Sequence, residues 1–255
     1  MFPFEFLWID RRQGNNREIM NEIFQLRFKV YCEEWGFEDP DQFPDGMERN
    51  EFDDKAEHFA IKSNRDGLLV GTARIIFPSD LGYPLRHHCT VDETLFMQVL
   101  GHVKEPIIGE VSRLAISKDF RKRIEDDFQL GYLSEPPDSQ HVGHEKRRYN
   151  FVHEFYNYLL LQSISLGLSH WYIAMKRSLY VLLKRVGMVY HPIGPEIDYH
   201  GLRTPYLGNL QEIREEMLKK NPYCFEFVEE LLKQATDSNV KSLLLPAPPS
   251  AAKNR

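Results

Sequence analysis

The chain has 255 residues, of which 42% are hydrophobic and 27% charged, and this composition excludes a largely disordered protein and leaves room for a sizeable core. The formal net charge of −6 argues against nucleic acid as the main partner, because a phosphate-binding surface normally leaves a basic footprint. Three cysteines at spacings typical of neither a disulfide framework nor a metal site fit a reducing, cytoplasmic compartment.

The N-terminal run MFPFEFLWID predicts a strand, because its aromatic residues fall at alternate positions. It is too short for a membrane span and has no basic region before it, so we expect neither a secretory signal nor an integral membrane segment.

A helix is predicted from Ile19 to about Glu34, where apolar residues recur at helical spacing. Arg27 falls one turn after Ile23 and therefore on the face that the helix should bury, where an unpaired charge is costly. The alternative is an arginine that extends past the edge of the core.

Two strands, HFAIKS and LLVGTARIIFP, follow an acidic loop and are joined by the turn NRDG, which predicts a hairpin. Arg74 shares a strand face with Val70 and Ile76, so a second arginine points from a strand that otherwise reads as buried. A solvent-facing edge strand is the alternative.

A short helix is predicted near VDETLFMQVLGH, and then the stretch PIIGEVSRLAIS, residues 106–117, reads as a further strand. Two opposite charges, Glu110 and Arg113, interrupt its apolar, β-prone sequence. The basic run KDFRKR follows directly.

The second half alternates helix and strand. We predict a long, central helix from Phe151 to Ile164, a strand at HWYIAMK, a helix at RSLYVLLKRVG that ends at Gly187, and a strand at MVYHPIG. Helices after Asn209 and Asn221 complete a single domain over residues 1–236, and we expect the remainder, 237–255, to be a mobile tail.

Several chemistries lack their motifs. The sequence has no glycine-rich phosphate loop, no nucleophile-elbow serine and no His-Glu-x-x-His helix. The histidines His87, His88, His141 and His144 are not spaced with carboxylates as metal ligands, so no metal is expected.

The charged positions form an ordered pattern: Arg27, Trp35, Glu48-x4-Asp53, GTAR ending at Arg74, and EVSR from Glu110 to Arg113. This pattern resembles the acyl-homoserine-lactone (autoinducer) synthases, which are acyltransferases of the GNAT superfamily. The stretches LRFKVYCEEWGFED, ERNEFDDKAEHF and GTARIIFP resemble more closely the acyltransferases associated with the exosortase (PEP-CTERM) sorting system, a group similar to long-chain N-acyl amino acid synthases. The extension IGPEIDYHGLRTPYLG also fits that group.

The resemblance implies an α/β GNAT (acyl-CoA N-acyltransferase-like) fold, with helices on both faces of a mixed sheet whose central strand is bulged and splayed from its neighbour. It also implies a charged acceptor site with Trp35 on a mobile flap above it, formed by Arg27, Glu48, Asp53, Arg74, Glu110 and Arg113. One departure is Asn50, which stands where autoinducer synthases usually carry an aspartate and so disfavours the cationic acceptor S-adenosylmethionine.

Acyl transfer from a thioester to an amine needs a proton acceptor, close positioning and a stabilised oxyanion, but no covalent enzyme intermediate. We expect Glu110 to be the base, directly or through water, and Arg113 to hold it ionised or to bind an acceptor carboxylate. A bulge between the two would bring both side chains to one pocket. Backbone N–H groups near Leu114 to Ile116 would serve the oxyanion.

The donor is expected to be acyl carrier protein rather than acyl-CoA, since ISKDFRKRI contains none of the glycines that usually hold the CoA pyrophosphate. No tightly bound cofactor is expected. An acidic carrier could meet Arg121, Lys122 and Arg123, with Lys146, Arg147 and Arg148 nearby, although solvated charge runs are the alternative.

These observations favour a long-chain N-acyl amino acid synthase acting on an amino acid or related small amine. The alternatives are an autoinducer synthase, a catalytically silent GNAT module that binds an acyl carrier, and a polyamine or aminoglycoside acetyltransferase.

Overall fold

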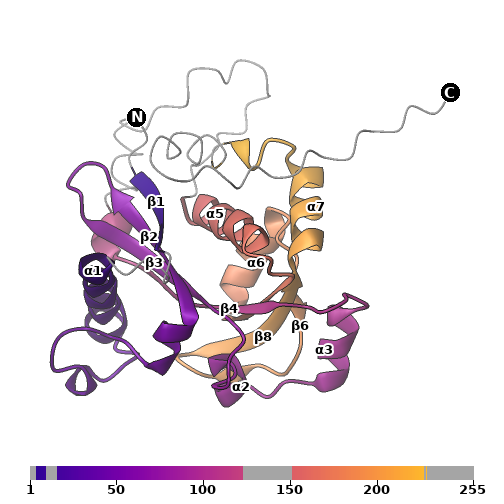
Figure 1. Cartoon of the computed structure of the whole chain (residues 1–255), viewed down its shortest axis with the longest axis horizontal. Coiled ribbons are helices and arrows are strands. Elements are labelled where there is room, and N and C mark those ends of the chain that lie inside the picture. The colour runs from indigo at the N-terminus through magenta and orange to yellow at the C-terminus, as the bar shows by residue number, and fades with distance from the viewer. Residues whose placement is uncertain (1–3, 10–15, 123–150, 227, 229–255) are drawn as a thin grey trace.

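The protein is described from a computed structural model that covers residues 4–9, 16–122, 151–226 and 228 (Figure 1). One mixed sheet has the strand order β1-β2-β3-β4-β5-β8-β6, with β7 paired to β8. All of its pairs are antiparallel except β4 with β5. The strands are β1 (Phe4–Ile9), β2 (Ala56–Ser63), β3 (Leu69–Ile76), β4 (Ile108–Ile116), β5 (His170–Met175), β6 (His191–Pro192), β7 (Ile197–Asp198) and β8 (Leu202–Asn209).

Helices cover both faces of this sheet, as predicted. On one face Ile23 of α1 packs against Ile9 and Ala60, and on the other α5 packs against Phe59. The helices are α1 (Arg17–Phe28), α2 (Pro84–His88), α3 (Glu93–Leu100), α5 (Phe151–Ser165), α6 (Arg177–Arg185) and α7 (Leu210–Lys220), with a π-helix η1 (Lys29–Glu34) and 3-10 turns η2 (Pro40–Gln42) and η3 (Glu51–Lys55).

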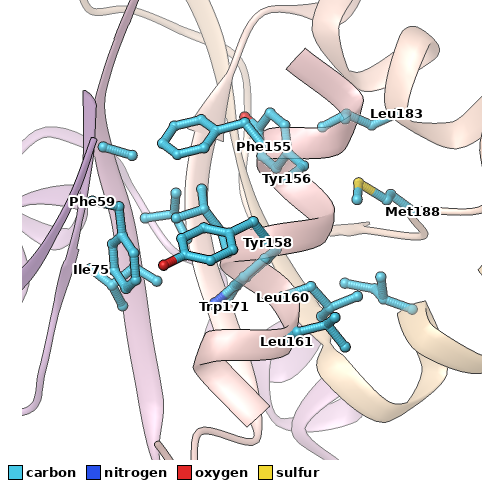
Figure 2. Close-up of a cluster of buried hydrophobic side chains, with 14 of the residues drawn as sticks. Phe59, Ile75, Phe155, Tyr156, Tyr158, Leu160, Leu161, Trp171, Leu183 and Met188 are labelled. Carbon is cyan, nitrogen blue, oxygen red and sulfur yellow. The ribbon is translucent and has the colours of Figure 1, made fainter. Parts of the chain in front are cut away.

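The long helix α5 is central, as its all-round apolar sequence predicts. Phe155, Tyr156 and Leu159 are fully buried, and the Tyr158 ring meets the Phe59 ring edge to face at 6.1 Å between centroids. Figure 2 shows the Tyr158 ring pointing from α5 toward Phe59 and Ile75 of the sheet, while Leu183 and Met188 lie on the other side of α5. The rigid core therefore lies on the α5 face, and the charged positions lie on the α1 face.

The observed elements depart from the predicted ones in several places, and α2, β7 and the two 3-10 turns were not predicted. The helix after Phe28 widens into the six-residue π-helix η1. The strand expected at MVYHPIG shrinks to His191–Pro192. Strand β8 was not predicted, because Pro205 removes a ladder donor and argues against a central strand. The expected tail, 237–255, and most of the helix after Asn221 lie outside the described residues.

The state of the cysteines and the presence of membrane-spanning helices were also considered in the sequence. Cys32, Cys89 and Cys224 are buried and free. In the described part of the chain, no helix is long and apolar enough to span a membrane.

Strand β4 carries the bulge and the splay that were expected of the central strand. Across from β3, Arg74 pairs with Ser112 and Thr72 with Ala115, so Arg113 and Leu114 together oppose Ala73. The bulge thus falls at Arg113 itself, one step later than predicted, and Arg113 adopts a φ of 50°.

On its other side β4 pairs with β5 only from Ile108 to Glu110. Beyond this pair, none of the described residues of β4 is joined to β5, and the two strands part. Glu110 is therefore the last residue of β4 that pairs with β5.

Candidate active site

Arg27 is the centre of a buried ion network on the α1 face of the sheet. Its Nε donates to Glu48 Oε2 at 2.5 Å, while Nη1 and Nη2 donate to the Asp53 carboxylate at 2.6 and 3.3 Å. Only 1% of Arg27 is exposed, so the side chain does not extend past the edge of the core. Two carboxylates from a distant loop neutralise the charge that the helix buries.

Arg74 joins the network from the middle of the sheet. Its Nη1 donates to Asp53 Oδ1 at 2.7 Å and to Asn50 Oδ1 at 2.8 Å, and its Nε donates to Ser112 Oγ at 3.0 Å. Because β3 lies between β2 and β4 and Arg74 is 1% exposed, the edge-strand alternative is wrong. Its Nη2 has no hydrogen-bond partner among the described residues.

Arg113 enters the same network because of the bulge. Its Nε donates to Glu48 Oε1 at 3.1 Å and its Nη2 donates to Glu38 Oε1 at 3.0 Å, while the guanidinium lies 5.2 Å from the Tyr31 ring centroid. In a regular strand a residue three positions after Glu110 would face the other side of the sheet. The left-handed backbone at Arg113 brings it to the Glu110 side.

The arginines control the protonation of the acids between them. Burial alone would raise the pKa of Asp53, but Arg27 and Arg74 hold it well below its ordinary value. Burial likewise opposes ionisation of Glu48, yet Arg27 and Arg113 lower its pKa. Buried His58, whose Nε2 lies 3.2 Å from the Asp53 carbonyl oxygen, has its pKa lowered to about 4, first by burial, and so is neutral near pH 7.

Glu110 behaves differently from Glu48 and Asp53. Burial raises its pKa to about 7, and the N–H of Leu85, which donates to Glu110 Oε2 at 2.8 Å, offsets only part of this. A carboxyl group with a pKa near neutrality can both accept and return a proton under ordinary conditions. Glu110 lies at the point where β4 and β5 part.

A cavity of about 490 Å³ opens beside the network. Arg74 and Arg113 form one part of its wall, and α2 and the β7–β8 turn form another. Glu110 lies behind the α2 part of this wall, because Leu85 directly follows the lining residue Pro84. The lining consists of Glu38, Asn50, Glu51, Phe52, Arg74, Pro84, His87, His88, Arg113, Tyr199 and His200.

A second cavity, of about 300 Å³, lies at the other end of the bulged segment. Arg121 and Lys122, two of the residues expected to meet the donor, line it together with Glu34, Trp35 and Lys118. Trp35, expected above the acceptor site, also lines this second cavity, half-exposed and stacked on Phe37 at 5.7 Å. Arg123, Lys146, Arg147 and Arg148 lie outside the described residues.

Between the two cavities run Leu114 and Ile116, expected to supply the backbone edge for the thioester. Their side chains pack against the α5 core, and between them only the small side chain of Ala115 packs on the α1 face, against Leu26, Val30 and Tyr31. The Tyr31 hydroxyl donates to the Leu114 carbonyl oxygen at 3.2 Å.

Several residues at the site were not predicted. Glu38 and Ser112 lie within the stretches LRFKVYCEEWGFED and EVSR but were not singled out, and nothing in the sequence indicated that the Leu85 N–H contacts Glu110. Tyr199 and His200 did carry a signal, since they lie in the extension IGPEIDYHGLRTPYLG. Among the described residues, no group of three or more His, Cys, Asp or Glu side chains could hold a metal ion.

Comparisons with known proteins agree with this architecture. Residues 26–128 match the model of the acetyltransferase (GNAT) domain. A search of curated proteins found no match. The chain has a GNAT-like fold, shared with a crystal structure of TofI at 16% identity and a TM-score of 0.55, over 85% of this chain and 95% of TofI.

Two further structures share the fold. The CoA-dependent acyl-homoserine lactone synthase BjaI is 16% identical, with a TM-score of 0.54 over 89% of this chain and 90% of BjaI. The AHL synthase LasI is 19% identical, with a TM-score of 0.51 over 81% of this chain and 90% of LasI.

Proposed function

From the premise that the chain has a GNAT-like fold, we propose that it is an N-acyltransferase that moves a long-chain fatty acyl group from acyl carrier protein to the amine of an amino acid or a related small amine. The observation that carries this proposal is the cavity walled by Arg74 and Arg113 beside the point where β4 parts from β5. A charged acceptor site and a slot for a thioester arm meet at one strand.

The reaction needs no covalent enzyme intermediate. The amine nitrogen attacks the thioester carbonyl carbon, and backbone N–H groups of the segment from Leu114 to Ile116 stabilise the resulting oxyanion. Glu110 takes a proton from the nitrogen, directly or through a water, and returns it to the sulfur as the C–S bond breaks. Its pKa of about 7 suits both transfers.

An acceptor with a carboxylate fits the cavity because of its arginines. Arg74 keeps Nη2 without a partner in the described structure, and Arg113 similarly uses Nε and Nη2 but not Nη1. Guanidinium N–H groups bind carboxylates well. Asn50, which accepts from Arg74 at 2.8 Å, adds no negative charge to this wall and therefore favours an anionic over a cationic acceptor.

Acyl carrier protein is favoured as donor by the start of the helix after β4. The Lys118 N–H donates to the two Glu34 carboxylate oxygens at 3.1 and 3.0 Å, so an acid of this chain already occupies an amide that a pyrophosphate would need. Arg121 and Lys122 beside it offer side-chain cations to an acidic carrier instead.

The test is to incubate the protein with long-chain acyl carrier protein and a panel of amino acids, and to look for acylated amine by mass spectrometry. The Glu110→Gln variant should lose turnover and still bind the acyl carrier. Absence of an acylated product from every amine, with carrier binding intact, would instead indicate a non-catalytic module.

An autoinducer synthase is the second candidate, because Glu38 and Glu51 also line the cavity and could face a cationic acceptor. Formation of an acyl-homoserine lactone and methylthioadenosine from S-adenosylmethionine, at a higher rate than any amino acid is acylated, would reverse the ranking.

A further inference from the structure

The turn between β7 and β8 closes one side of the cavity of about 490 Å³ that is proposed to hold the acceptor, the acceptor cavity. Tyr199 and His200, at this turn, both line the cavity, and Tyr199 stacks on His88 of α2 with 4.2 Å between ring centroids. The turn lies well beyond residue 128, where the match to the GNAT domain ends. The turn therefore contributes a phenol and an imidazole side chain to the cavity from outside the matched segment.

His200 is held in a defined orientation. Its Nε2 lies 3.6 Å from Glu38 Oε1, the same oxygen that accepts from Arg113. Its ring packs against Phe37 at 5.3 Å, and its backbone has a φ of 54°, a conformation that few residues other than glycine adopt. A carboxylate beside Nε2 favours the tautomer with hydrogen on Nε2, which leaves the Nδ1 lone pair as an acceptor.

Nδ1 has no hydrogen-bond partner in the part of the chain that the structure describes, and His200 lines the cavity. Burial, first of all, lowers the pKa of the imidazole, so the ring is neutral near pH 7 and able to take a proton. The charged and titratable groups that face it from the neighbouring elements are Glu38, Arg113, Arg203 and His88.

We infer that His200, oriented by Glu38, accepts the first proton of the acceptor ammonium and thereby generates the nucleophilic amine. This inference rests on the proposed function. An ammonium must lose two protons in all: one before it attacks the thioester and one from the tetrahedral adduct. The first passes to His200 and then to solvent, and the second reaches the leaving sulfur through Glu110.

This division of roles follows from where the two groups lie. His200 is part of the cavity wall, where an acceptor amine arrives, whereas Glu110 lies behind α2 at the last residue pair before the slot. In the tetrahedral adduct the nitrogen and the sulfur are bonded to the same carbon, so Glu110 can serve both, whereas His200 meets the ammonium earlier, as it enters the cavity. Two proton acceptors at two places meet both needs.

The pH profile of kcat/KM for the amine is the main test, with His200→Gln as the variant. Without a bound base the variant depends on free amine from solution, whose fraction rises about tenfold per pH unit below the amine's own pKa. We expect a loss of roughly 10²-fold at pH 7 that shrinks steadily toward pH 9. A loss that is the same at every pH would overturn the inference and leave His200 as a binding group.

The matched control is His191→Gln. His191 also faces a glutamate, with Nε2 3.1 Å from Glu212 Oε2, but it lies on β6 and does not line the cavity. Its pH profile should follow that of the wild type. If the wild type itself acylates no amine, the proposed function fails and the inference fails with it, an outcome distinct from parallel profiles.

A second variant tests proton transfer without depending on the glutamine side chain. His200→Gly suits the left-handed backbone and should fold, as circular dichroism can verify. Added imidazole should restore its rate saturably at pH 7 and should leave the wild type and His191→Gln unchanged. No restoration, in a folded variant that still binds the amine, would count against a proton-transfer role.

Discussion

The two cavities beside the bulged segment of β4 use charge in opposite ways. Beside the larger cavity, which is proposed to hold the acceptor, buried arginines are paired with acids, and Arg27 is held between Glu48 and Asp53. In the smaller cavity, which is proposed to face the acyl donor and is called the donor cavity, Arg121 is partly exposed and lies 3.8 Å from Glu34, and Lys122 is exposed. One set of charges is locked in place, and the other faces water.

This difference separates two tasks. Buried ion pairs gain little net stability over apolar side chains, but breaking one is costly, so they hold neighbouring groups in a fixed arrangement. Exposed cations contribute little to stability and act over distance on an approaching charged partner. We therefore propose that the buried pairs fix the position of the acceptor and that the exposed cations attract the donor, and variants at the two places distinguish these effects.

The largest effect is expected from Arg27→Ala. Removing the guanidinium leaves Glu48 and Asp53 buried and unpaired, so the free energy of unfolding should fall by about 3–5 kcal/mol, as measured by urea denaturation. Lys29→Ala, nearby on η1, breaks the exposed pair with Asp119 and should cost less than ~1 kcal/mol. Equal losses of unfolding free energy in the two variants would mean that buried and exposed ion pairs do not differ in their contribution to stability.

Glu110→Gln tests a buried acid that, unlike Glu48 and Asp53, releases its proton only near pH 7. Because the pKa of Glu110 is raised to about 7 in the folded protein, the native state binds a proton that the unfolded state has released above about pH 4.5. Its contribution to stability is therefore present at low pH and is lost as pH rises through 7.

The wild type should lose about 3 kcal/mol between pH 4.5 and 8 relative to Glu110→Gln, whose amide does not titrate. Urea denaturation of both proteins at a series of pH values measures this difference. A constant difference across the range would mean that Glu110 is ionised in the folded protein and is not tuned for proton transfer.

The buried, paired arginines could be predicted from the sequence, because each one occupies a position that the apolar periodicity assigns to the interior. Arg27 and Arg74 fall on faces that the apolar pattern marks as internal, and such arginines need acids. The bulge in β4 followed from the same argument, since Glu110 and Arg113 can share a side only if the strand alternation breaks. The position of the bulge was off by one residue, because sterically equivalent placements look alike in sequence.

Long-range placement could not be predicted in this way. Trp35 follows the π-helix, stacks on Phe37 and lies beside Arg121, and the sequence indicated neither contact. Glu38 and His200 are separated by more than a hundred and sixty residues. The path of β8 brings them together, and Pro205 argues in sequence against a strand there. Contacts that depend on how an unpredicted strand crosses the sheet leave no local pattern.

A smaller effect is expected from Asn50→Asp, which adds a fourth acid to the acceptor network. Its carboxylate would take the place of the amide oxygen that accepts from Arg74 at 2.8 Å and would compete with an acceptor carboxylate for that arginine. KM for an anionic amino acid should rise about tenfold, equivalent to about 1.4 kcal/mol, with kcat less affected. Asn50→Ser, which keeps a neutral N-cap acceptor for Phe52, controls for the 3-10 turn.

If Asn50→Asp instead lowers KM for the amino acid, the acceptor group near Arg74 is cationic. The variant should then also accept S-adenosylmethionine better than the wild type does. Both measurements use the same acyl-transfer assay, so the sign of the change identifies the charge of the acceptor.

The smallest effect is expected from removing the exposed cations of the donor cavity. The double variant Arg121→Ala/Lys122→Ala should leave stability and kcat close to the wild type and raise KM for acyl carrier protein several-fold, because these cations line the donor cavity. The increase should vanish at high salt, since exposed charges are screened beyond about 10 Å at 0.1 M ionic strength. Lys104→Ala, in the loop before β4, is the control, because the nine residues of β4, about 30 Å, separate it from Lys122. A rise in KM that persists at high salt, or that appears equally in Lys104→Ala, would mean that the carrier docks elsewhere and that the slot is entered from a different edge of the sheet.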